Sequence, residues 1–155
     1  MKKEEFMRRA VELSRQSMEQ GGGPFGAVIV KNGKIVGEGA NGVTLNCDPT
    51  AHAEVTAIRQ AAQNLEEFDL NGCEIYTSCE PCPMCLGAIY WARLDKIYYS
   101  NDRQDAKEAG FDDSLIYDEI ALTPEERSIG MEKVADPHAR EIFRQWTQKA
   151  DKTEY

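Results

Sequence analysis

One histidine and two cysteines of this chain have a spacing that suits zinc binding, and a glutamate lies close to the histidine in the sequence. Cys82 and Cys85 are three positions apart, directly after a proline that suits the start of a helix. His52 lies 30 positions before Cys82, and Glu54 follows His52 by two. Two thiolates and an imidazole are ligands that zinc prefers, and three protein ligands leave a fourth position for water. The pattern therefore predicts catalytic zinc, with Glu54 placed to carry protons.

A cysteine pair of this spacing also suits other kinds of site. A redox pair follows a strand and opens a helix in the same way, but it leaves His52 and Glu54 without a role. A structural zinc site needs a fourth ligand, for which Cys79 is available, and Glu54 again has no function there. A degenerate enzyme kept as a zinc-stabilised binding module would retain the same ligands. Cys47, Cys73 and Cys79 are most simply small buried hydrophobic residues.

Length and composition indicate one globular domain. The chain has 155 residues, of which 41% are hydrophobic and 29% are charged. No apolar run has the length of a membrane span, and the start lacks the apolar run of a signal peptide. Five cysteines, an odd number, do not indicate a disulfide framework. We therefore expect a single domain over residues 1–155, located in the cytoplasm, with reduced thiols and no membrane partner.

The charge balance argues against a polyanionic substrate. There are 27 acidic residues against 18 basic ones, which gives a net charge of −9. Proteins that bind nucleic acids gain most of their affinity by neutralising phosphates with lysine and arginine, and this sequence has no basic cluster. We therefore expect no nucleic-acid partner.

The zinc ligands need a scaffold that brings two distant helix starts together. Strands and helices alternate after an amino-terminal helix and a hairpin, which indicates an α/β fold with a mixed sheet covered by helices. The Asn32-Gly33 pair predicts a type I′ turn in the hairpin. Neighbouring strand ends in one sheet would bring His52 and Cys82 together. The predicted helices cover 3–19, 48–65, 82–93, 105–109, 115–120 and 137–150, and the predicted strands cover 25–30, 35–39, 73–77, 96–100 and 129–134.

His-x-Glu followed by Pro-Cys-x-x-Cys is the signature of the zinc deaminases. Over residues 5–120 the chain resembles the cytidine deaminase-like superfamily. The resemblance is densest in Gly-Pro-Phe-Gly-Ala-Val at 23–28, Asp-Pro-Thr-Ala-His-Ala-Glu at 48–54 and Ser-Cys-Glu-Pro-Cys-Pro-Met-Cys at 78–85. It implies a three-layer α/β/α sandwich and one zinc ion per subunit. It assigns His52, Cys82 and Cys85 to the metal and proton transfer to Glu54.

Within this superfamily the chain is similar to the bacterial guanine deaminases. The similarity lies in Phe25, in Ala-Gly-Phe-Asp-Asp-Ser at 109–114 and in a long C-terminal helix ending in Glu-Tyr at 154–155. It implies hydrolysis of guanine to xanthine and ammonia in purine catabolism or salvage. Water would attack C2 of the base, and Glu54 would pass one proton to ring N3 and later a second proton to the leaving amine.

The same similarity implies further roles around the base. Asn41 and Asp113 would bind its polar edge, while Phe25, Trp91 and Tyr155 would bound its flat faces. Members of the family are homodimers in which the C-terminal segment crosses to the partner subunit. The segment at 136–155 is therefore expected to form a helix and tail that cover the partner's active site by a domain swap.

The motifs define the chemistry more firmly than the substrate, because several deaminases share them. A tRNA adenosine deaminase is the first alternative, expected to act on a flipped anticodon base, and the acidic charge argues against it. A cytosine or nucleoside deaminase is the next. A zinc-stabilised binding module is the alternative outside the enzymes.

Overall fold

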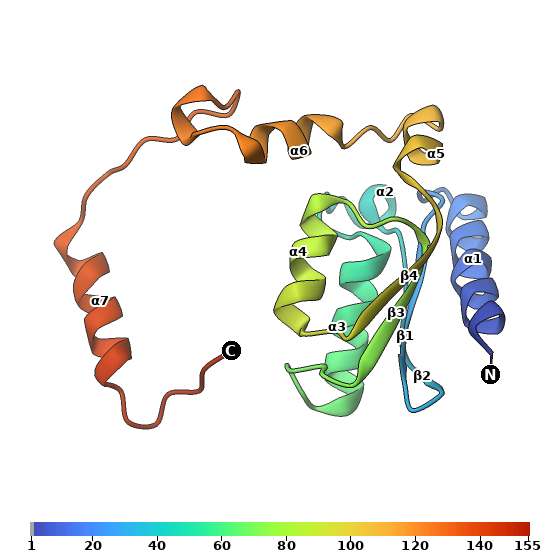
Figure 1. Cartoon of the computed structure of the whole chain (residues 1–155), viewed down its shortest axis with the longest axis horizontal. Coiled ribbons are helices and arrows are strands. Elements are labelled where there is room, and N and C mark those ends of the chain that lie inside the picture. Colours follow the sequence, from blue (N-terminus) through green and yellow to red (C-terminus); the bar gives the residue numbers. More distant parts are fainter. Residues whose placement is uncertain (1) are drawn as a thin grey trace. The chain divides into compact units, whose positions relative to one another are not determined.

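A four-stranded sheet in the order β2-β1-β3-β4 organises the first part of the chain (Figure 1). The computed structural model describes residues 2–155 and divides them into a first unit that ends at Ser114 and a second unit, Leu115–Tyr155. The strands are β1 (Gly26–Lys31), β2 (Lys34–Ala40), β3 (Cys73–Cys79) and β4 (Lys96–Asn101). β1 is antiparallel to β2 and β3, whereas β3 and β4 are parallel. The start of β1 and the carboxyl ends of the other three strands therefore lie at the same end of the sheet.

The hairpin between β1 and β2 has the predicted turn. Asn32 has φ 49° and Gly33 has φ 73°, the two positive values that a type I′ turn requires. Neither residue belongs to a strand, and the ladder resumes with Lys31 opposite Lys34. The prediction of a two-residue hairpin is confirmed.

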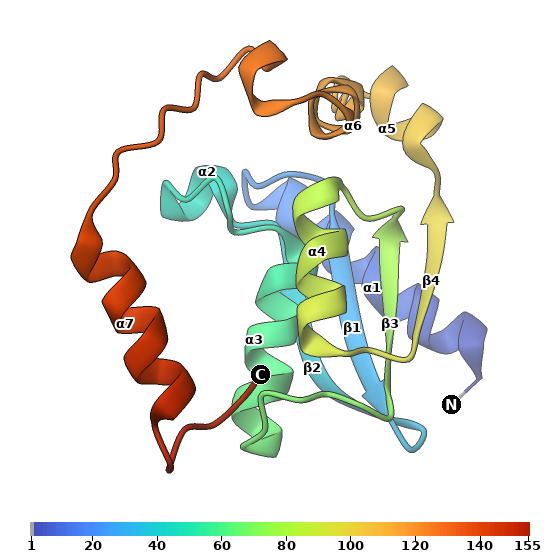
Figure 2. The same ribbon diagram turned by 60° about the vertical axis from the view of Figure 1, so that its left-hand side comes forward.

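Helices cover both faces of the sheet (Figure 2). On one face, α1 (Lys3–Glu19) packs against β1 and β3 through a cluster formed by Phe6, Leu13, Val28, Val30 and Tyr76. On the other face, α3 (Ala53–Leu65) and α4 (Pro83–Ala92) share a second cluster with the sheet, which includes Ala27, Ile29, Ala57, Ile75 and Ile89. The mixed sheet between two helical layers is the α/β/α arrangement expected from the sequence.

Two glycines of β2 let α3 lie directly on the sheet. A Cβ atom on Gly37 would lie 2.6 Å from the carbonyl oxygen of Ala57, and one on Gly39 would lie 2.2 Å from that of Ala53. Such separations are too short for a side chain, so only glycine permits this approach. The contact places the start of α3 against the last residues of β2, at the end of the sheet where β3 also finishes.

The remaining elements of the described chain are four short helical segments and one longer helix. They are α2 (Val43–Asn46), α5 (Arg103–Glu108), α6 (Ser114–Ala121), the 3₁₀ helix η1 (Pro124–Glu126) and α7 (Pro137–Gln148). The sequence did not indicate α2, and Cys47 directly after this helix is exposed, not buried as expected, whereas Cys73 and Cys79 are buried. The strand predicted over 129–134 is wrong, because no strand of the described chain pairs with these residues and they remain irregular. None of the described helices is long and apolar enough to cross a membrane.

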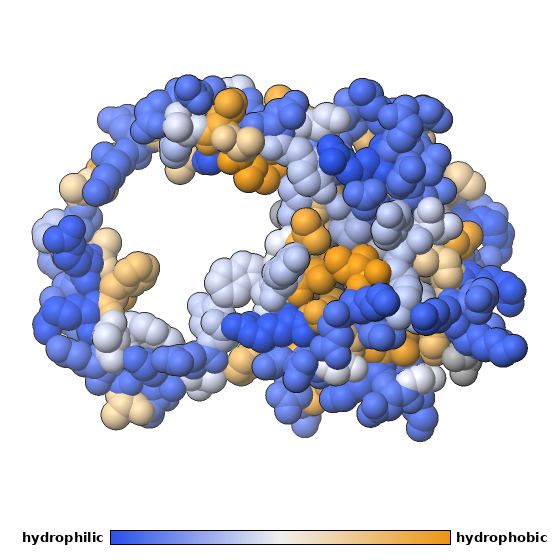
Figure 3. All heavy atoms as spheres, viewed as in Figure 1, coloured by the Kyte–Doolittle hydropathy of each residue, from blue (hydrophilic) through white to orange (hydrophobic). Residues whose placement is uncertain are grey.

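The second unit has no interior of its own. All residues of Leu115–Tyr155 are described, and none of them is buried. Side chains that proteins usually bury are open, among them Ile129, Val134 and Phe143, each of which is at least 78% exposed. Figure 3 shows apolar side chains gathered over α6. These side chains need a covering surface that the unit does not provide by itself.

Candidate active site

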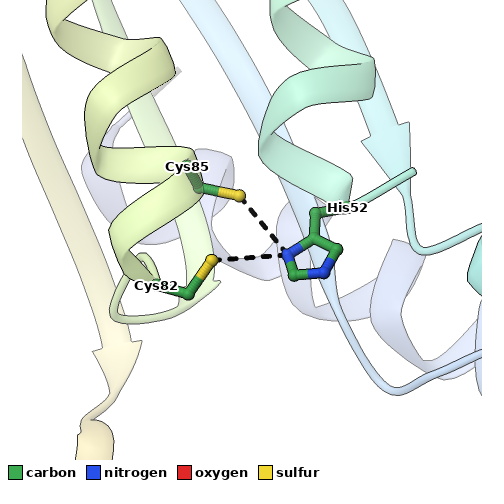
Figure 4. Close-up of side chains that lie close together, drawn as sticks. All are labelled: His52, Cys82 and Cys85. Carbon is green, nitrogen blue, oxygen red and sulfur yellow. Dashed lines mark hydrogen bonds between the residues drawn. The ribbon is translucent and has the colours of Figure 1, made fainter. Parts of the chain in front are cut away.

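The three predicted zinc ligands lie together. Nδ1 of His52 is 3.5 Å from Sγ of Cys82 and 3.5 Å from Sγ of Cys85 (Figure 4). All three ligand atoms lie within 4.8 Å of one another. Bonds of about 2.1 Å to nitrogen and 2.3 Å to sulfur in a tetrahedral zinc site separate these atoms by about 3.6 Å. The donor set therefore fits zinc in both chemistry and spacing.

Each ligand occupies the start of a helix. His52 immediately precedes α3 and Cys82 immediately precedes α4, both with extended backbone, while Cys85 lies in the first turn of α4. The sequence placed His52 in the first turn of its helix, but Asp48 accepts hydrogen bonds from Thr50 and holds the preceding residues in a turn. The positive ends of two helix dipoles point at the thiols, which favours thiolates there.

The protonation of the two thiols is linked. A hydrogen bond from Cys85, together with the contact with His52, lowers the pKa of Cys82 to about 4 despite its burial. The same hydrogen bond and burial raise the pKa of Cys85. The hydrogen bond with Cys82 raises the pKa of His52. The Cys82 thiolate therefore accepts hydrogen bonds from both Cys85 and His52. A cation between the three side chains would replace these protons and be bound by all three groups.

Glu54 is a buried carboxyl beside these ligands. It lies in the first turn of α3, is 6% exposed, and interacts with Cys85. Burial raises the pKa of the Glu54 carboxyl. An ionised carboxylate in the protein interior is costly unless a charge or hydrogen bond compensates it, so this position favours a group that exchanges protons.

Asn41 directly follows the end of β2, in a segment that lies beside the loop that carries His52. Its N–H donates to the carbonyl oxygen of Phe25 at 3.0 Å, and the N–H of Gly42 donates to that of Ala51 at 2.8 Å. The Oδ1 atom of Asn41 accepts from the N–H of Val43 at 3.1 Å. The backbone thus places Asn41 between the start of β1 and the residue that precedes the histidine ligand.

Phe25 and Asp113 belong to other segments that lie near the same end of the sheet. The ring of Phe25 meets the edge of the Phe111 ring, with centroids 4.9 Å apart and an angle of 82°. Asp113 is half-buried and lies 3.7 Å from Nε of Arg103. Burial first, and then the charges of Glu54, Glu80, Asp113 and Asp105, raise the pKa of Cys79 to about 11. The Glu54 and Asp113 carboxylates therefore both lie within electrostatic reach of this thiol.

Phe111 was expected only as part of the motif at 109–114, without an individual role. An aromatic residue two positions before Asp113 was the available signal. Its edge-on contact makes Phe111 a support for Phe25, because such pairs fix the orientation of both rings.

Trp91 and Tyr155 are placed differently from the other predicted base contacts. Trp91 lies near the far end of α4, nine positions after Cys82, which is about 13 Å along a helix. Its side chain is 66% exposed. Tyr155 belongs to the second unit and is also exposed. The structure does not bring Trp91 to the zinc ligands of its own chain, and the roles of both residues stay predictions.

Comparison with known proteins gives consistent relatives. The family model described as the cytidine and deoxycytidylate deaminase zinc-binding region matches residues 1–101. Guanine deaminase from Bacillus subtilis is 54% identical over 156 residues, covering 100% of both chains. A tRNA-specific adenosine deaminase from Aquifex aeolicus is 42% identical over 64% of this chain and 66% of its own length.

Solved structures agree. The crystal structure of guanine deaminase from Bacillus subtilis matches with a TM-score of 0.97 and covers 100% of this chain and 99% of that chain. Guanine deaminase from Nitrosomonas europaea matches with a TM-score of 0.70 at 30% identity, covering 81% of this chain and 69% of that chain. With the ligand geometry and the family model in agreement, this chain belongs to the zinc-dependent deaminase family that is defined by the cytidine and deoxycytidylate deaminase zinc-binding region.

Proposed function

We propose that this chain deaminates guanine, giving xanthine and ammonia, in purine catabolism or salvage. The observation that carries this choice is the extent of the similarity. The guanine deaminase from Bacillus subtilis matches over the whole chain, including the second unit, whereas the tRNA-specific adenosine deaminase from Aquifex aeolicus matches over 100 residues. The net charge of −9 also favours a small base over a nucleic acid.

His52, Cys82 and Cys85 hold the metal. A zinc ion held by these residues would supply a Lewis acid that lowers the pKa of a water molecule to roughly 7. Glu54 takes one proton from the attacking water and delivers it to ring N3 of guanine. It then takes the second proton, from the hydroxyl formed on C2, and passes it to the amine, which leaves as ammonia while the C2 carbonyl forms. Its burial and its raised pKa suit this exchange, because a proton carrier works best with a pKa near the working pH.

Base recognition would use one amide, one carboxylate and one aromatic ring. The Oδ1 atom of Asn41 is already bonded to Val43, which leaves its Nδ2 group to donate to an acceptor of the base. The Asp113 carboxylate would accept from a ring N–H, and Phe25 would cover one face. Leaving such a polar group of a buried base unpaired costs about 1–3 kcal/mol, so these contacts would favour guanine over adenine and cytosine.

The second unit would complete the site of a partner subunit. Its exposed apolar side chains require a covering surface, and α7 presents Ile142, Phe143 and Trp146 within two turns. A homodimer with exchanged C-terminal segments would bury them and carry Tyr155 to the partner's base. We also propose a cytoplasmic location, because thiol ligands for zinc need a reducing compartment.

A substrate panel tests the proposed function. Zinc-loaded protein is given guanine, adenine, cytosine, their nucleosides and tRNA, and ammonia release is measured. We expect turnover of guanine with the largest kcat/KM and equimolar xanthine. Preferred deamination of tRNA would instead establish the adenosine deaminase alternative. Absence of ammonia from every substrate, with zinc at one ion per subunit, would leave the binding module.

A further inference from the structure

Ser17 is a buried residue of α1 that the proposed mechanism does not use. It is 3% exposed, and its Oγ donates to the main-chain carbonyl oxygen of Asn41 at 2.9 Å. Serine hydroxyls in helices commonly bond to a carbonyl of the preceding turn, as Ser14 does with Val11 at 2.6 Å. Ser17 instead reaches a residue 24 positions away.

The loop after α1 closes around this hydrogen bond. The N–H of Gly22 donates to the main-chain oxygen of Ser17 at 2.8 Å. A Cβ atom on Gly22 would lie 2.4 Å from Oγ of Ser17 and 2.9 Å from the carbonyl oxygen of Asn41. Any side chain at this position would occupy the space of the hydrogen bond, so glycine is required there.

The neighbouring glycine bounds the side chain of Asn41 itself. A Cβ atom on Gly23 would lie 3.1 Å from Cγ, 3.2 Å from Oδ1 and 3.4 Å from Nδ2 of Asn41. The amide group therefore lies flat against Gly23, and a methyl group there would push it by a few tenths of an ångström. The carboxamide plane is set by this contact and by the bond from Val43 to Oδ1.

Together these contacts fix Asn41 from three sides. Its N–H donates to Phe25, its carbonyl oxygen accepts from Ser17, and its Oδ1 accepts from Val43. Within residues 2–155 no hydrogen bond is found for its Nδ2 group. All other polar atoms of Asn41 are committed, and the one that remains is a donor.

We propose that Ser17, framed by Gly22 and Gly23, is a positioning residue that holds Asn41 so that its Nδ2 group meets an acceptor of the purine base. This inference rests on the proposed function, because it takes Asn41 as a base contact. Groups that recognise a substrate work best when surrounding residues fix them before binding, and Ser17 supplies that support from outside the site.

A double-mutant cycle tests the inference. Ser17→Ala should lower kcat/KM for guanine about 2- to 10-fold, because one hydrogen bond that positions the amide is lost. In an Asn41→Ala background the same change should have no further effect on kcat/KM, since the group that Ser17 positions is gone. Ser14→Ala, a matched serine of the same helix, should leave kcat/KM unchanged in both backgrounds. An equal loss from Ser17→Ala in both backgrounds would overturn the positioning role.

A second measurement does not depend on turnover. The side-chain NH₂ signals of Asn41 in an ¹H–¹⁵N spectrum can be assigned by their loss in Asn41→Asp. They should move in Ser17→Ala and in Gly23→Ala and stay in place in Ser14→Ala, with thermal unfolding recorded for each variant. Signals that do not move in Ser17→Ala would overturn the inference, whatever the substrate. Asn41→Ala with unchanged guanine kcat/KM would contradict the proposed base contact instead, while the spectrum would still report on Ser17.

Discussion

The unit that ends at Ser114 and the unit Leu115–Tyr155 differ in how they use apolar side chains. The first buries them on both faces of a sheet, with a helix on one side and two on the other. The second buries none, although it contains eleven large hydrophobic side chains that are exposed, from Leu115 to Tyr155. The first unit can therefore hold residues at fixed distances, which metal binding and proton transfer require, whereas the second unit has no buried core of its own.

Polar interactions show the same contrast. In the first unit, Arg9 of α1 donates two hydrogen bonds of 2.7 Å to Glu38 of β2, 29 positions away. In the second unit, the ion pairs join near neighbours, as Lys149 and Asp151 do at 2.6 Å. Long-range pairs support a tertiary structure, and local pairs support only the helix or turn in which they occur.

The largest effect should come from removing a zinc ligand. His52→Ala should abolish metal binding and turnover, because a catalytic zinc site needs three protein ligands and only the two cysteines would remain. The first unit should lose stability, since metal that binds only the folded state adds to the free energy of unfolding. Metal content, ammonia release and thermal unfolding measure these changes. Stoichiometric zinc in His52→Ala would refute the ligand assignment.

The next effect concerns proton transfer without loss of the metal. Glu54→Gln should retain zinc and fold but lower kcat about 10²- to 10⁴-fold, because the amide cannot exchange protons with water and base. Glu74→Gln, a half-buried glutamate of β3, serves as the control and should keep normal turnover. Near-normal kcat in Glu54→Gln would exclude Glu54 as the proton carrier.

A smaller effect should follow a charge on the apolar side of α7. Phe143→Asp should weaken dimer formation by about 2 kcal/mol, roughly 30-fold, because a carboxylate would replace a ring at the interface. Zinc content should stay the same, since the first unit holds all three ligands. Sedimentation compares this variant with Gln145→Asp on the same helix. Unchanged association of Phe143→Asp would show that α7 does not contribute to a dimer.

The smallest effect concerns the long-range ion pair. The hydrogen bond from Arg9 lowers the pKa of Glu38 below its ordinary value of 4.5. A carboxyl whose folded pKa is lowered adds stability above its unfolded pKa and loses that contribution as the pH falls through the folded pKa. Because both side chains are partly exposed, we expect less than about 1 kcal/mol. The unfolding free energies of wild type and Glu38→Gln should differ at pH 7, and this difference should shrink as the pH falls through the lowered pKa of Glu38. A difference that stays constant down to the acid limit of folding would exclude this cause.

The zinc site could be predicted from the sequence because its residues form two local motifs. His52 with Glu54, and Cys82 with Cys85, each lie at a recognisable helix start, and the rules of sheet topology bring the two starts together. Hairpin geometry was equally predictable, since Asn32-Gly33 is one of few pairs that accept two positive φ angles.

The features that escaped prediction depend on contacts between distant segments. The bond from Ser17 to Asn41 has no local pattern, and neither has the fit of Ala53 and Ala57 against the glycines of β2. Apolar spacing alone suggested a strand at 129–134, but a strand forms only where another backbone pairs with it. Local patterns therefore identified the chemistry, and packing determined how the site is supported.

We propose that the first unit of one subunit and the second unit of its partner together make a complete site. Two variants test it directly: Glu54→Gln, which lacks the proton carrier, and Tyr155→Ala, which lacks the proposed cover and should raise KM about 3- to 10-fold. They are co-expressed with different tags, the hybrid dimer is isolated, and guanine turnover is measured at low substrate concentration. If the segments are exchanged, the hybrid has one site with both residues intact and should show half of the wild-type rate, well above either variant alone. A hybrid rate equal to the mean of the two variants would contradict the claim.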